Sequence, residues 1–497
     1  MTSEPASLPG PAPLPIVWTI AGSDSGGGAG IQADLKTFQA LGVHGCSVIT
    51  ALTAQNTQRM VRIEHTAPGM IEAQLLALQE DLPPAAIKIG MLGSAAAIQV
   101  VAGFLQQRDT YVVCDPVMMA TQGGSLLDPG AYSTFREGLL PRVDLLTPNL
   151  AEAGSLLGLV MDTVAEVEQG ARDLLALGPK SVLIKGGHGH GPLSRDYWTD
   201  GRRAFWINSP RLATSSTHGG GCTLSAAIAA GWANGLTELD AVVLGKAYIN
   251  HGLRHAQPVG HGRNPLAHGT WPDHPADLPW LALPGEEAFQ TLEFPNPGKL
   301  PLGLYPVVDR ASWIERLLAL GVDLIQLRAK DLTGPALEAE VRQAIEVGRR
   351  AGARVYINDH WELALRHGAY GVHLGQDDLP AADLAALAQA GLRLGLSAHG
   401  YAEVARAHKM RPSYIALGTL FESPSKTFAH QPLGLPAFTR LRKLIAEPVV
   451  AIGGITVERA PDVLRAGADG LAVISDLTRA ADLGGRVKQW QSLWRST

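Results

Sequence analysis

The chain has 497 residues, which at roughly 150 residues per domain corresponds to about three domain-equivalents or two larger α/β domains. Apolar residues make up 46% and charged residues 18%, with 56 glycines and 33 prolines, and this composition excludes collagen-like, coiled-coil and wholly disordered chains. Because 41 lysines and arginines face 46 acidic residues, the net charge of −5 gives no basic field for nucleic acid or for an anionic membrane, so any phosphate binding is expected to be local.

The stretch 1–15 is rich in proline, alanine and serine and has neither a basic leader nor a continuous apolar core. We expect a disordered tail here and not a signal peptide. The rest of the chain contains no apolar run of roughly 18 residues, so no transmembrane helix is expected. The three cysteines, Cys46, Cys114 and Cys222, form no CxxC pair, which favours a reducing compartment, by default the cytoplasm, over a disulfide framework or a zinc site.

Strand and helix signals alternate from residue 16 to residue 272. Apolar stripes predict a helix over 29–41 and strands at 16–20 and near positions 48, 87, 112, 145 and 182. The alternation predicts a three-layer α/β domain. The segment contains neither GxxxxGK[ST] nor GxGxxG, so neither a P-loop nor the dinucleotide fingerprint is supported.

A glycine turn, THGGGCT at 217–223, leads into a helical run of small residues at 224–232. Such a turn would aim several backbone N–H groups at a bound anion. An ordinary helix start with packing glycines accounts for the same residues about equally well. Cys222 favours the functional interpretation, because a thiol at a helix N-terminus has a lowered pKa and could act as thiolate base or nucleophile. Cys46 and Cys114 lie inside apolar runs and are expected to be buried filler.

A second glycine cluster, AGSDSGGGAG at 21–30, lies between the first strand and the helix that carries Asp34. Backbone without side chains can approach a small ligand closely. Further along, Asp115 and Lys185 follow predicted strands, and Glu152 follows TPNLA. Carboxylates and a lysine at strand ends suit magnesium and phosphate.

Residues 16–271 resemble the hydroxymethylpyrimidine and hydroxymethylpyrimidine-phosphate kinases of the ribokinase-like fold. The matching segments occur in order: AGSDSGGGAGIQADLKTFQALGVHGCSVITALTAQNT, KIGML, CDPVM, LLTPNLAEA, LIKGGH and THGGGCTLSAA. The resemblance implies ATP as the phosphoryl donor, Mg²⁺, and a cysteine base where wider ribokinases have aspartate. It assigns the anion hole to Gly219, Gly220 and Gly221, the base to Cys222, a nucleotide-phosphate contact to Lys185, magnesium-linked acids to Asp115 and Glu152, and pyrimidine contacts to Gly22, Asp34, Gln55, Met91 and Val117.

Two positions depart from that family. Gly220 stands where threonine is usual, and TQGG at 121–124 stands where Ala/Ser-Lys-Ser-Gly is usual. The first change removes a hydroxyl but keeps the backbone N–H groups of the anion hole, so activity is expected to survive. The second removes a cation, which is expected to weaken nucleotide binding.

Nine prolines fall between 258 and 301, and such a segment holds neither long helices nor central strands. We expect a proline-rich linker over 273–299. Three histidines in this region, His261, His268 and His274, are irregularly spaced, so a solvated linker is favoured over a metal site.

Beyond the linker, eight short β-rich apolar runs alternate with helical segments, and they lie at 304–308, 324–327, 355–357, 371–374, 394–396, 414–417, 449–452 and 471–474. The count favours a (β/α)8 TIM barrel over 300–497, with a doubly wound sheet as the alternative. In a barrel the loops after the strands carry the chemistry. Gln326 and Arg328 are two residues apart and so face the same side, toward the barrel mouth. Cations and carboxylates there are the composition for a diphosphate held with Mg²⁺.

This half resembles thiamine-phosphate synthase through GLYPVVD, QLRAKD, YINDHW, YGVHLGQDDL, LGLSAH, YIALGTLFESPSK, VAIGGI and AVIS. The resemblance assigns the pyrimidine diphosphate to Gln326, Arg328, Lys330, Asn358, Ser397 and Lys426, Mg²⁺ to Asp359 and Asp378, and the thiazole phosphate to Gly454 and Ser475. Ser423 and Ser425 stand where Thr-x-Thr is usual and keep the hydroxyls that bind substrate.

The two resemblances interlock, because the first half would make the diphosphate that the second half consumes. They imply a bifunctional thiamine-biosynthesis enzyme with small-molecule partners, no nucleic acid and no membrane, and a homo-oligomer remains open. One alternative keeps the folds but changes the reactions to a pyridoxal-type kinase or a thiazole tautomerase, although QLRAK and SPSK argue against the tautomerase. Another is an inactive kinase domain that acts as a pyrimidine-binding module beside an active synthase.

Overall fold

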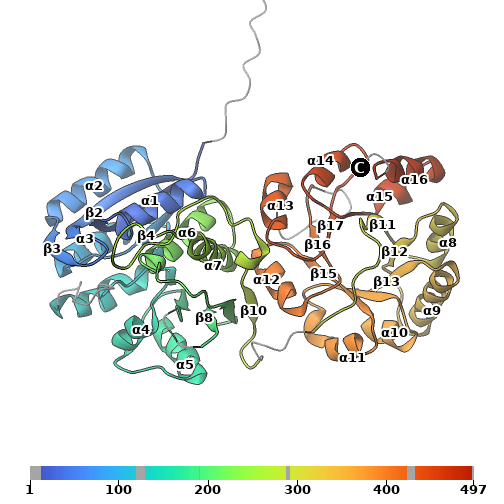
Figure 1. Ribbon diagram of the computed structural model, residues 1–497, viewed down its shortest axis with the longest axis horizontal. Coiled ribbons are helices and arrows are strands. Elements are labelled where there is room, and N and C mark those ends of the chain that lie inside the picture. Colours follow the sequence, from blue (N-terminus) through green and yellow to red (C-terminus); the bar gives the residue numbers. More distant parts are fainter. Residues whose placement is uncertain are drawn as a thin grey trace, which may run out of the picture. The chain divides into compact units, whose positions relative to one another are not determined.

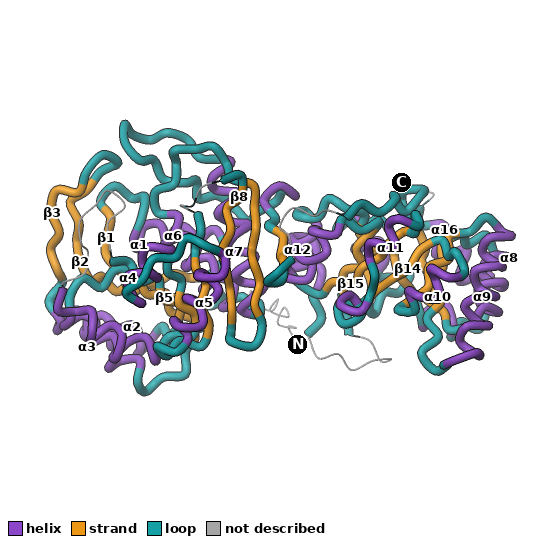
Figure 2. Tube along the Cα trace, turned by 90° about the horizontal axis from the view of Figure 1, so that it is seen from below, coloured by secondary structure: helices purple, strands orange, loops and turns teal. Residues whose placement is uncertain are grey.

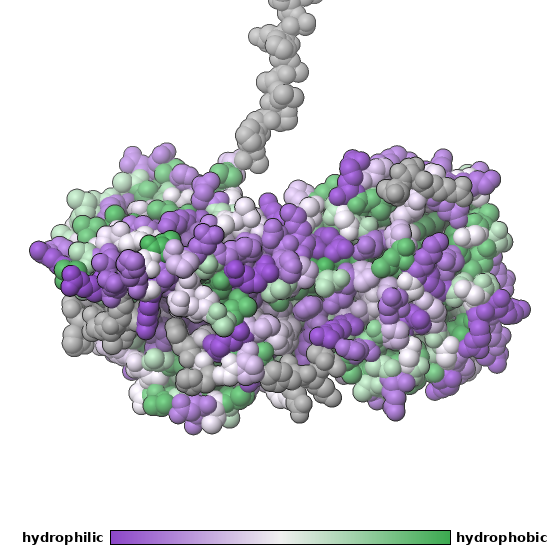
Figure 3. Space-filling view, viewed as in Figure 1, coloured by the Kyte–Doolittle hydropathy of each residue, from purple (hydrophilic) through white to green (hydrophobic). Residues whose placement is uncertain are grey.

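The computed structural model describes residues 13–118, 129–187, 189, 191–286, 292–422 and 431–494. The chain divides into two compact units, Met1–Trp271 and Pro272–Thr497. In Figure 1 the first unit runs from blue to green and the second from yellow-green to red. No helix within the described ranges is both long enough and apolar enough to cross a membrane. Figure 3 shows polar and apolar side chains intermixed over the visible face.

The first unit is built around one mostly parallel sheet. Its strands are β1 (Ile16–Asp24), β2 (His44–Gln55), β3 (Met60–His65), β4 (Ala86–Ile89), β5 (Tyr111–Cys114), β6 (Leu145–Leu146), β7 (Ser181–Ile184), β8 (Leu193–Thr199) and β9 (Ala204–Pro210). Its helices are α1 (Gly30–Ala40), α2 (Pro68–Asp81), α3 (Ala95–Leu105), α4 (Leu150–Leu157), α5 (Val164–Leu175), α6 (Gly220–Ala233) and α7 (Glu238–Arg254).

The strands lie in the order β9-β8-β7-β6-β5-β4-β1-β2-β3, with β3, β8 and β9 antiparallel to their neighbours. Helices cover both faces of the sheet, with α2 and α3 on the opposite side from α1 and α6 in Figure 2. Helix α6 packs on α1 and α7 and against β1, β4 and β5. Its run of alanines is almost entirely buried, because small side chains let a helix approach a sheet closely. The predicted three-layer α/β domain is confirmed.

The second unit contains a closed barrel of parallel strands in chain order. Its strands are β11 (Gly303–Val308), β12 (Leu324–Leu327), β13 (Arg354–Asn358), β14 (Gly371–Leu374), β15 (Arg393–Ala398), β16 (Tyr414–Gly418), β17 (Val449–Ile452) and β18 (Gly470–Val473). Its helices are α8 (Ala311–Ala319), α9 (Gly334–Ala351), α10 (Trp361–Arg366), α11 (Leu384–Gln389), α12 (Tyr401–Met410), α13 (Gly434–Arg442), α14 (Ala460–Arg465), α15 (Ser475–Thr478) and α16 (Leu483–Ser492). The predicted TIM barrel is confirmed, and the doubly wound alternative is wrong.

The described part of the predicted linker is ordered against the second unit. It contains only one 3-10 turn, Pro275–Asp277, and the short strand β10 (Trp280–Ala282), as its prolines require. The stretch 293–299 is held by side chains at the amino ends of the barrel strands. Ser413 Oγ donates to Pro295 O at 2.5 Å, and Tyr370 OH donates to Pro297 O at 3.1 Å. Residues 272–286 and 292–299 fall within the second compact unit, and barrel side chains hold the stretch 293–299.

Candidate active sites

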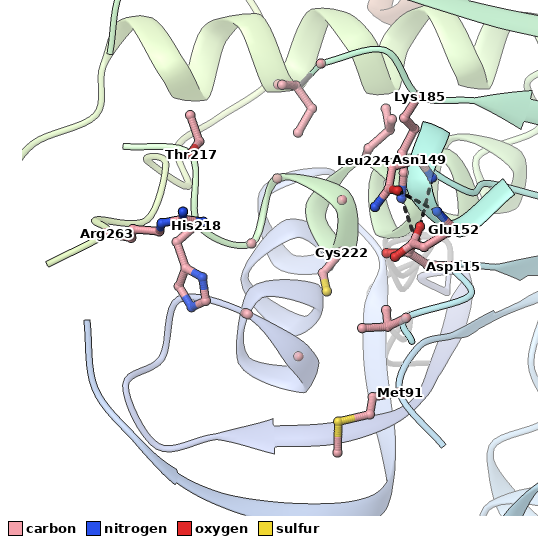
Figure 4. A pocket seen from close by; sticks show the side chains of 18 of the residues that line it. Met91, Asp115, Asn149, Glu152, Lys185, Thr217, His218, Cys222, Leu224 and Arg263 are labelled. Carbon is pink, nitrogen blue, oxygen red and sulfur yellow. Dashed lines mark hydrogen bonds and ion pairs between the residues drawn. The ribbon is translucent and has the colours of Figure 1, made fainter. Parts of the chain in front are cut away.

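A cavity of about 510 Å³ opens in the first unit where β1, β4, β5 and β7 end. Open α/β sheets bind ligands at the carboxyl ends of their strands, so its position follows from the topology. Figure 4 shows side chains from these strand ends and from the start of α6 pointing into it. The predicted residues that line it are Gly22, Gln55, Met91, Asp115, Val117, Glu152, Lys185, Gly219, Gly220, Gly221 and Cys222.

The glycine turn stands at the start of α6 and faces two charged side chains. Gly219 precedes the helix with φ +76°, a conformation that favours glycine, and a Cβ there would overlap the carbonyl oxygen of Gly28. A Cβ on Gly221 would lie 3.1 Å from Lys185 Nζ and 3.3 Å from Asp115 Oδ2. The first N–H groups of a helix have no acceptor within it. The turn can therefore hold a phosphoryl group between its N–H groups and the Lys185 ammonium.

Two carboxylates and this lysine form a charged cluster on the cavity wall. Lys185 Nζ lies 2.5 Å from Asp115 Oδ1, and both side chains are largely buried. Glu152 Oε2 accepts from the backbone N–H of Asn149 at 2.8 Å, in the capping box that begins α4. Burial raises the pKa of Glu152 to about 7, and the charges of Lys185 and Asp115 act on that pKa in opposite directions. Paired carboxylate oxygens that leave further positions to phosphates and water are the ligands Mg²⁺ prefers, so Asp115 and Glu152 fit this ion.

The structure places Cys222 in the first turn of α6, where it is half-buried and lines the cavity. Burial raises the pKa of the Cys222 thiol to about 11, the Lys88 ammonium lowers it, and the carboxylates of Asp34 and Asp115 raise it. The helix start is present as predicted. Burial and the helix terminus act on the pKa of this thiol in opposite directions.

Asp34 does not reach the cavity. Its carboxylate is completely buried, accepts from Lys88 Nζ at 2.8 and 3.0 Å, and accepts from Thr19 Oγ1 at 2.6 Å. Lys88 lines the cavity, whereas Asp34 is not among the residues that line it. The structure thus separates Asp34 from the other residues assigned to the pyrimidine. The sequence analysis gave no role to Lys88. A lysine inside the apolar strand AIKI was the signal that could have identified it.

Asp24 and His218, to which the sequence analysis gave no role, connect the two glycine-rich segments. Asp24 Oδ2 accepts from the N–H groups of Gly28 and Ala29 at 3.0 and 2.8 Å and lies 3.3 Å from His218 Nε2. His218 directly precedes Gly219 of the anion turn. Asp24 therefore fixes the loop 24–30 and the anion turn relative to each other. An aspartate within a glycine run was the available signal, since its side chain satisfies loop N–H groups.

The remaining cavity wall is apolar and closely fitted. A Cβ on Gly22 would lie 3.0 Å from Met91 Cε, so glycine leaves room for the methionine that covers this side. Gln55 is positioned through its backbone, which accepts from and donates to Ser25 Oγ at 2.8 and 2.9 Å. The Gln55 side chain also forms a hydrogen bond with the Asp24 carboxylate, and this bond helps to lower the pKa of Asp24.

The barrel carries a second cluster of charge at the carboxyl ends of β13 and β14. Asp359 takes a left-handed backbone conformation with φ +62° and lies 3.2 Å from Lys330 Nζ. Burial raises the pKa of Asp378, and the nearby carboxylate of Asp359 raises it further. Two carboxylates in direct contact and beside a lysine fit Mg²⁺ with a diphosphate. The structure thus brings the two predicted Mg²⁺ ligands, Asp359 and Asp378, next to each other.

The other predicted barrel residues lie around the same end of the strands. Gln326 and Asn358 are buried, Arg328 and Ser397 are half-buried, and Ser475 begins α15. Gly454 has φ +61°, and a Cβ there would lie 2.6 Å from the carbonyl oxygen of Glu422, so only glycine fits this loop after β17. Three predicted substrate residues, Ser423, Ser425 and Lys426, and the 121–124 loop lie outside the described residues.

Comparison with known proteins matches both units to families. Residues 24–267 match the family model of phosphomethylpyrimidine kinase, and residues 304–477 match that of thiamine monophosphate synthase. The chloroplastic thiamine biosynthetic bifunctional enzyme of Arabidopsis thaliana is 36% identical over 480 residues, which are 93% of this chain and 90% of that protein.

Single-function relatives cover one unit each. The hydroxymethylpyrimidine/phosphomethylpyrimidine kinase of Synechococcus elongatus is 46% identical over 51% of this chain and 97% of its own length. The thiamine-phosphate synthase of Yersinia pestis is 54% identical over 36% of this chain and 85% of its own length. The first unit accordingly has the ribokinase-like fold that the resemblance implied. The chain belongs to the family of bifunctional thiamine biosynthetic enzymes, which join a phosphomethylpyrimidine kinase to a thiamine monophosphate synthase.

Proposed function

We propose that the first unit phosphorylates 4-amino-5-hydroxymethyl-2-methylpyrimidine twice at the expense of ATP. The hydroxyl receives the first phosphoryl group, and the resulting monophosphate receives the second. The barrel then couples this diphosphate with 4-methyl-5-(2-phosphoethyl)thiazole to give thiamine phosphate and pyrophosphate. The observation that carries the proposal is one chain matching both family models, with the product of the first being the substrate of the second.

In the kinase reaction the residues of the cavity position and neutralise charge, which is most of what phosphoryl transfer requires. The N–H groups of Gly219, Gly220 and Gly221 and the Lys185 ammonium would hold the transferred group. Asp115 and Glu152 would hold Mg²⁺, which supplies charge neutralisation on the phosphates when bound. Cys222 would take the proton of the substrate hydroxyl as a thiolate, and the Lys88 ammonium favours that charged form.

In the synthase reaction the bond between the pyrimidine methylene carbon and the diphosphate oxygen breaks, and both electrons leave with pyrophosphate. The electron-rich aminopyrimidine stabilises the methylene cation, and the thiazole nitrogen then forms the new carbon–nitrogen bond. Arg328, Lys330 and Mg²⁺ held by Asp359 and Asp378 would stabilise the departing charge. Gly454 and Ser475 would bind the thiazole phosphate, and no nucleophilic side chain is needed.

The partners proposed are small molecules: the pyrimidine and its phosphates, the thiazole phosphate and ATP. We retain the cytoplasm as the proposed location. The Arabidopsis relative carries the word chloroplastic in its name. A homo-oligomer remains a proposal that the solution mass would decide.

Two half-assays separate this function from an inactive kinase domain. The purified chain with the hydroxymethylpyrimidine and MgATP should form the diphosphate, and the chain with supplied diphosphate and thiazole phosphate should form thiamine phosphate without ATP. Synthesis only from supplied diphosphate would favour the pyrimidine-binding module, and faster turnover of pyridoxal would favour the pyridoxal-type kinase.

A further inference from the structure

A chain of buried hydrogen bonds joins Gln326 and Ser397, two barrel residues assigned to the pyrimidine diphosphate. Gln326 Nε2 donates to Tyr305 OH at 3.3 Å, and Tyr305 OH lies 2.7 Å from Tyr414 OH. Tyr414 OH lies 2.8 Å from His373 Nδ1, and His373 Nε2 lies 2.9 Å from Ser397 Oγ. The chain therefore passes through the barrel interior across five strands, β12, β11, β16, β14 and β15.

Solvent cannot take the place of a member of this chain. The exposed fractions of Tyr305 and Tyr414 are 1% each, and those of Gln326 and His373 are 5% and 6%. The barrel is built around it: a Cβ on Gly395 would overlap the ring and hydroxyl of Tyr414. A buried polar group without a partner costs free energy, so each group in the chain is held to its neighbours.

Each member of the chain carries a fixed number of hydrogens, so the direction of one hydrogen bond sets the direction of the others. Burial raises the pKa of both tyrosines, so each hydroxyl keeps its single hydrogen. Because Tyr305 OH accepts from Gln326, it donates to Tyr414 OH, which in turn donates to Nδ1 of His373. A neutral imidazole with a bare Nδ1 carries its hydrogen on Nε2 and donates it to Ser397 Oγ. In this state the Gln326 carbonyl can accept a hydrogen bond from a ligand, and the Ser397 hydroxyl can donate one to it.

Every group is also paired when the hydrogen bonds run in the opposite direction. There the Gln326 carbonyl accepts from Tyr305, every hydroxyl turns, and Ser397 donates to His373. In that state Gln326 would offer N–H groups to a ligand, and Ser397 would offer only an acceptor. The hydrogen-bonding character of the two side chains therefore changes together.

We propose that this chain is a specificity device, in which Tyr305, Tyr414 and His373 couple the amide orientation of Gln326 to the donor state of Ser397. The proposal rests on the proposed synthase function. A ligand with an exocyclic amine, such as the aminopyrimidine, donates to the Gln326 carbonyl and thereby selects the state in which Ser397 donates. A ligand with an oxo group at that position requires the opposite state at both residues. The three intermediate residues are positioning residues, since none of them needs to touch the substrate.

The test compares Tyr305→Phe and Tyr414→Phe with Tyr356→Phe in the full chain. Tyr356 is a matched control: its ring is fully buried and packs edge-on against both other rings, and its hydroxyl has no hydrogen-bond partner within the described structure. The synthase reaction is run with supplied diphosphate and thiazole phosphate and without ATP. Inhibition constants are measured for the aminopyrimidine monophosphate and for its counterpart with an oxo group in place of the amine.

The wild-type chain should favour the amino ligand, and Tyr305→Phe and Tyr414→Phe should each reduce that preference about tenfold, the effect of one buried hydrogen bond. Tyr356→Phe should keep the wild-type ratio. The double variant Tyr305→Phe/Tyr414→Phe should lose no more of the preference for the amino ligand than either single variant loses, because the chain of hydrogen bonds acts as a unit. Two results would overturn the proposal. One is an equal ratio of inhibition constants in the wild type and the three single variants, and the other is a loss of preference in Tyr356→Phe as large as in Tyr305→Phe and Tyr414→Phe.

A measurement on the wild-type chain covers the case in which a variant fails to fold. ¹⁵N NMR of histidine-labelled protein saturated with the aminopyrimidine monophosphate should show His373 with a bare Nδ1 and hydrogen on Nε2, and the reverse tautomer would overturn the proposal. Failure of the proposed function gives a different result. The wild-type protein would then form no thiamine phosphate from supplied diphosphate, and the proposed coupling of Gln326 to Ser397 would be rejected together with the synthase function.

Discussion

Lys88 Nζ lies 2.8 Å from Asp34 Oδ2, and neither side chain is reached by solvent. Burial alone would lower the pKa of Lys88, but the carboxylates of Asp34 and Asp115 raise it above its ordinary value, so the amine stays charged. The pair thus holds an ammonium group on the wall of the cavity that contains the predicted phosphoryl-transfer site. This explains why Asp34 is withdrawn from the ligand while Lys88 lines the cavity.

Replacing Lys88 by methionine should destabilise the first unit, because it leaves the Asp34 carboxylate buried without its partner. Loss of one member of a buried pair costs about 3–5 kcal/mol. Urea unfolding followed by tryptophan fluorescence measures the change. The double variant Lys88→Met/Asp34→Asn should recover part of the loss, and a change below about 1 kcal/mol in the single variant would contradict the assigned pairing.

Replacing Cys222 by alanine should abolish pyrimidine phosphorylation and leave the synthase rate unchanged when diphosphate is supplied. The expected loss is about 10²- to 10⁴-fold in kcat, the usual contribution of a general base. Cys46→Ala is the matched control, since Cys46 is a buried cysteine in β2 outside the cavity wall. Kinase activity of Cys222→Ala near that of Cys46→Ala would exclude the thiol as the base.

The affinity for MgATP should rise with pH up to about 7. Burial raises the pKa of Glu152 from its usual 4.5 to about 7, so below pH 7 a proton competes with Mg²⁺ for this carboxylate. Each pH unit below 7 should weaken binding by up to about tenfold, measured by calorimetry at pH 6 and pH 8. The same shift affects stability. Between pH 4.5 and 7 the folded protein keeps a proton on Glu152 that the unfolded protein has lost, so the stability of the first unit should fall as the pH rises through this window.

Glu166→Gln is the matched control for Glu152→Gln. Both glutamates complete a capping box at the start of a helix, α4 for Glu152 and α5 for Glu166, but Glu166 is exposed and outside the cavity. Glu152→Gln should weaken MgATP binding and remove its pH dependence, whereas Glu166→Gln should change neither. A pH dependence retained in Glu152→Gln would assign it to another group.

The substitution Gly395→Ala should lower synthase activity and leave kinase activity unchanged. The new Cβ would overlap Tyr414, which must move and so break the hydrogen-bond chain to Ser397. We expect a loss of synthase kcat/KM of about tenfold or more, the cost of a displaced buried group. Gly484→Ala, in α16, is the control, because its Cβ would meet no atom closer than 3.6 Å. Equal activity in the two variants would show that Tyr414 adapts.

Much of the fold was predictable because the signals are local. Runs such as 304–308 and 449–452 are short, apolar and β-branched, and their number set the barrel. The anion turn was predictable because consecutive glycines directly before a helical run of small residues are typical of a helix start that binds an anion. The raised pKa of Cys222 was not predictable, since a pKa depends on burial by segments distant in sequence.

Long-range contacts limited the site prediction in the same way. Asp34 lies in a helix beside the glycine loop, which favours a ligand contact, and only the fold reveals that Lys88 of β4 covers it. The proline-rich stretch 293–299 has the composition of a linker. Its backbone carbonyls nevertheless accept hydrogen bonds from Tyr370, Arg354 and Ser413, whose positions no local pattern encodes.

The most direct test of the whole account is one incubation of the purified chain with the hydroxymethylpyrimidine, MgATP and the thiazole phosphate, followed by mass spectrometry of the pyrimidine products. The account predicts thiamine phosphate as the end product, with the monophosphate and diphosphate as transient species. Untouched pyrimidine would contradict the kinase assignment, and a diphosphate that accumulates without thiamine phosphate would contradict the synthase assignment.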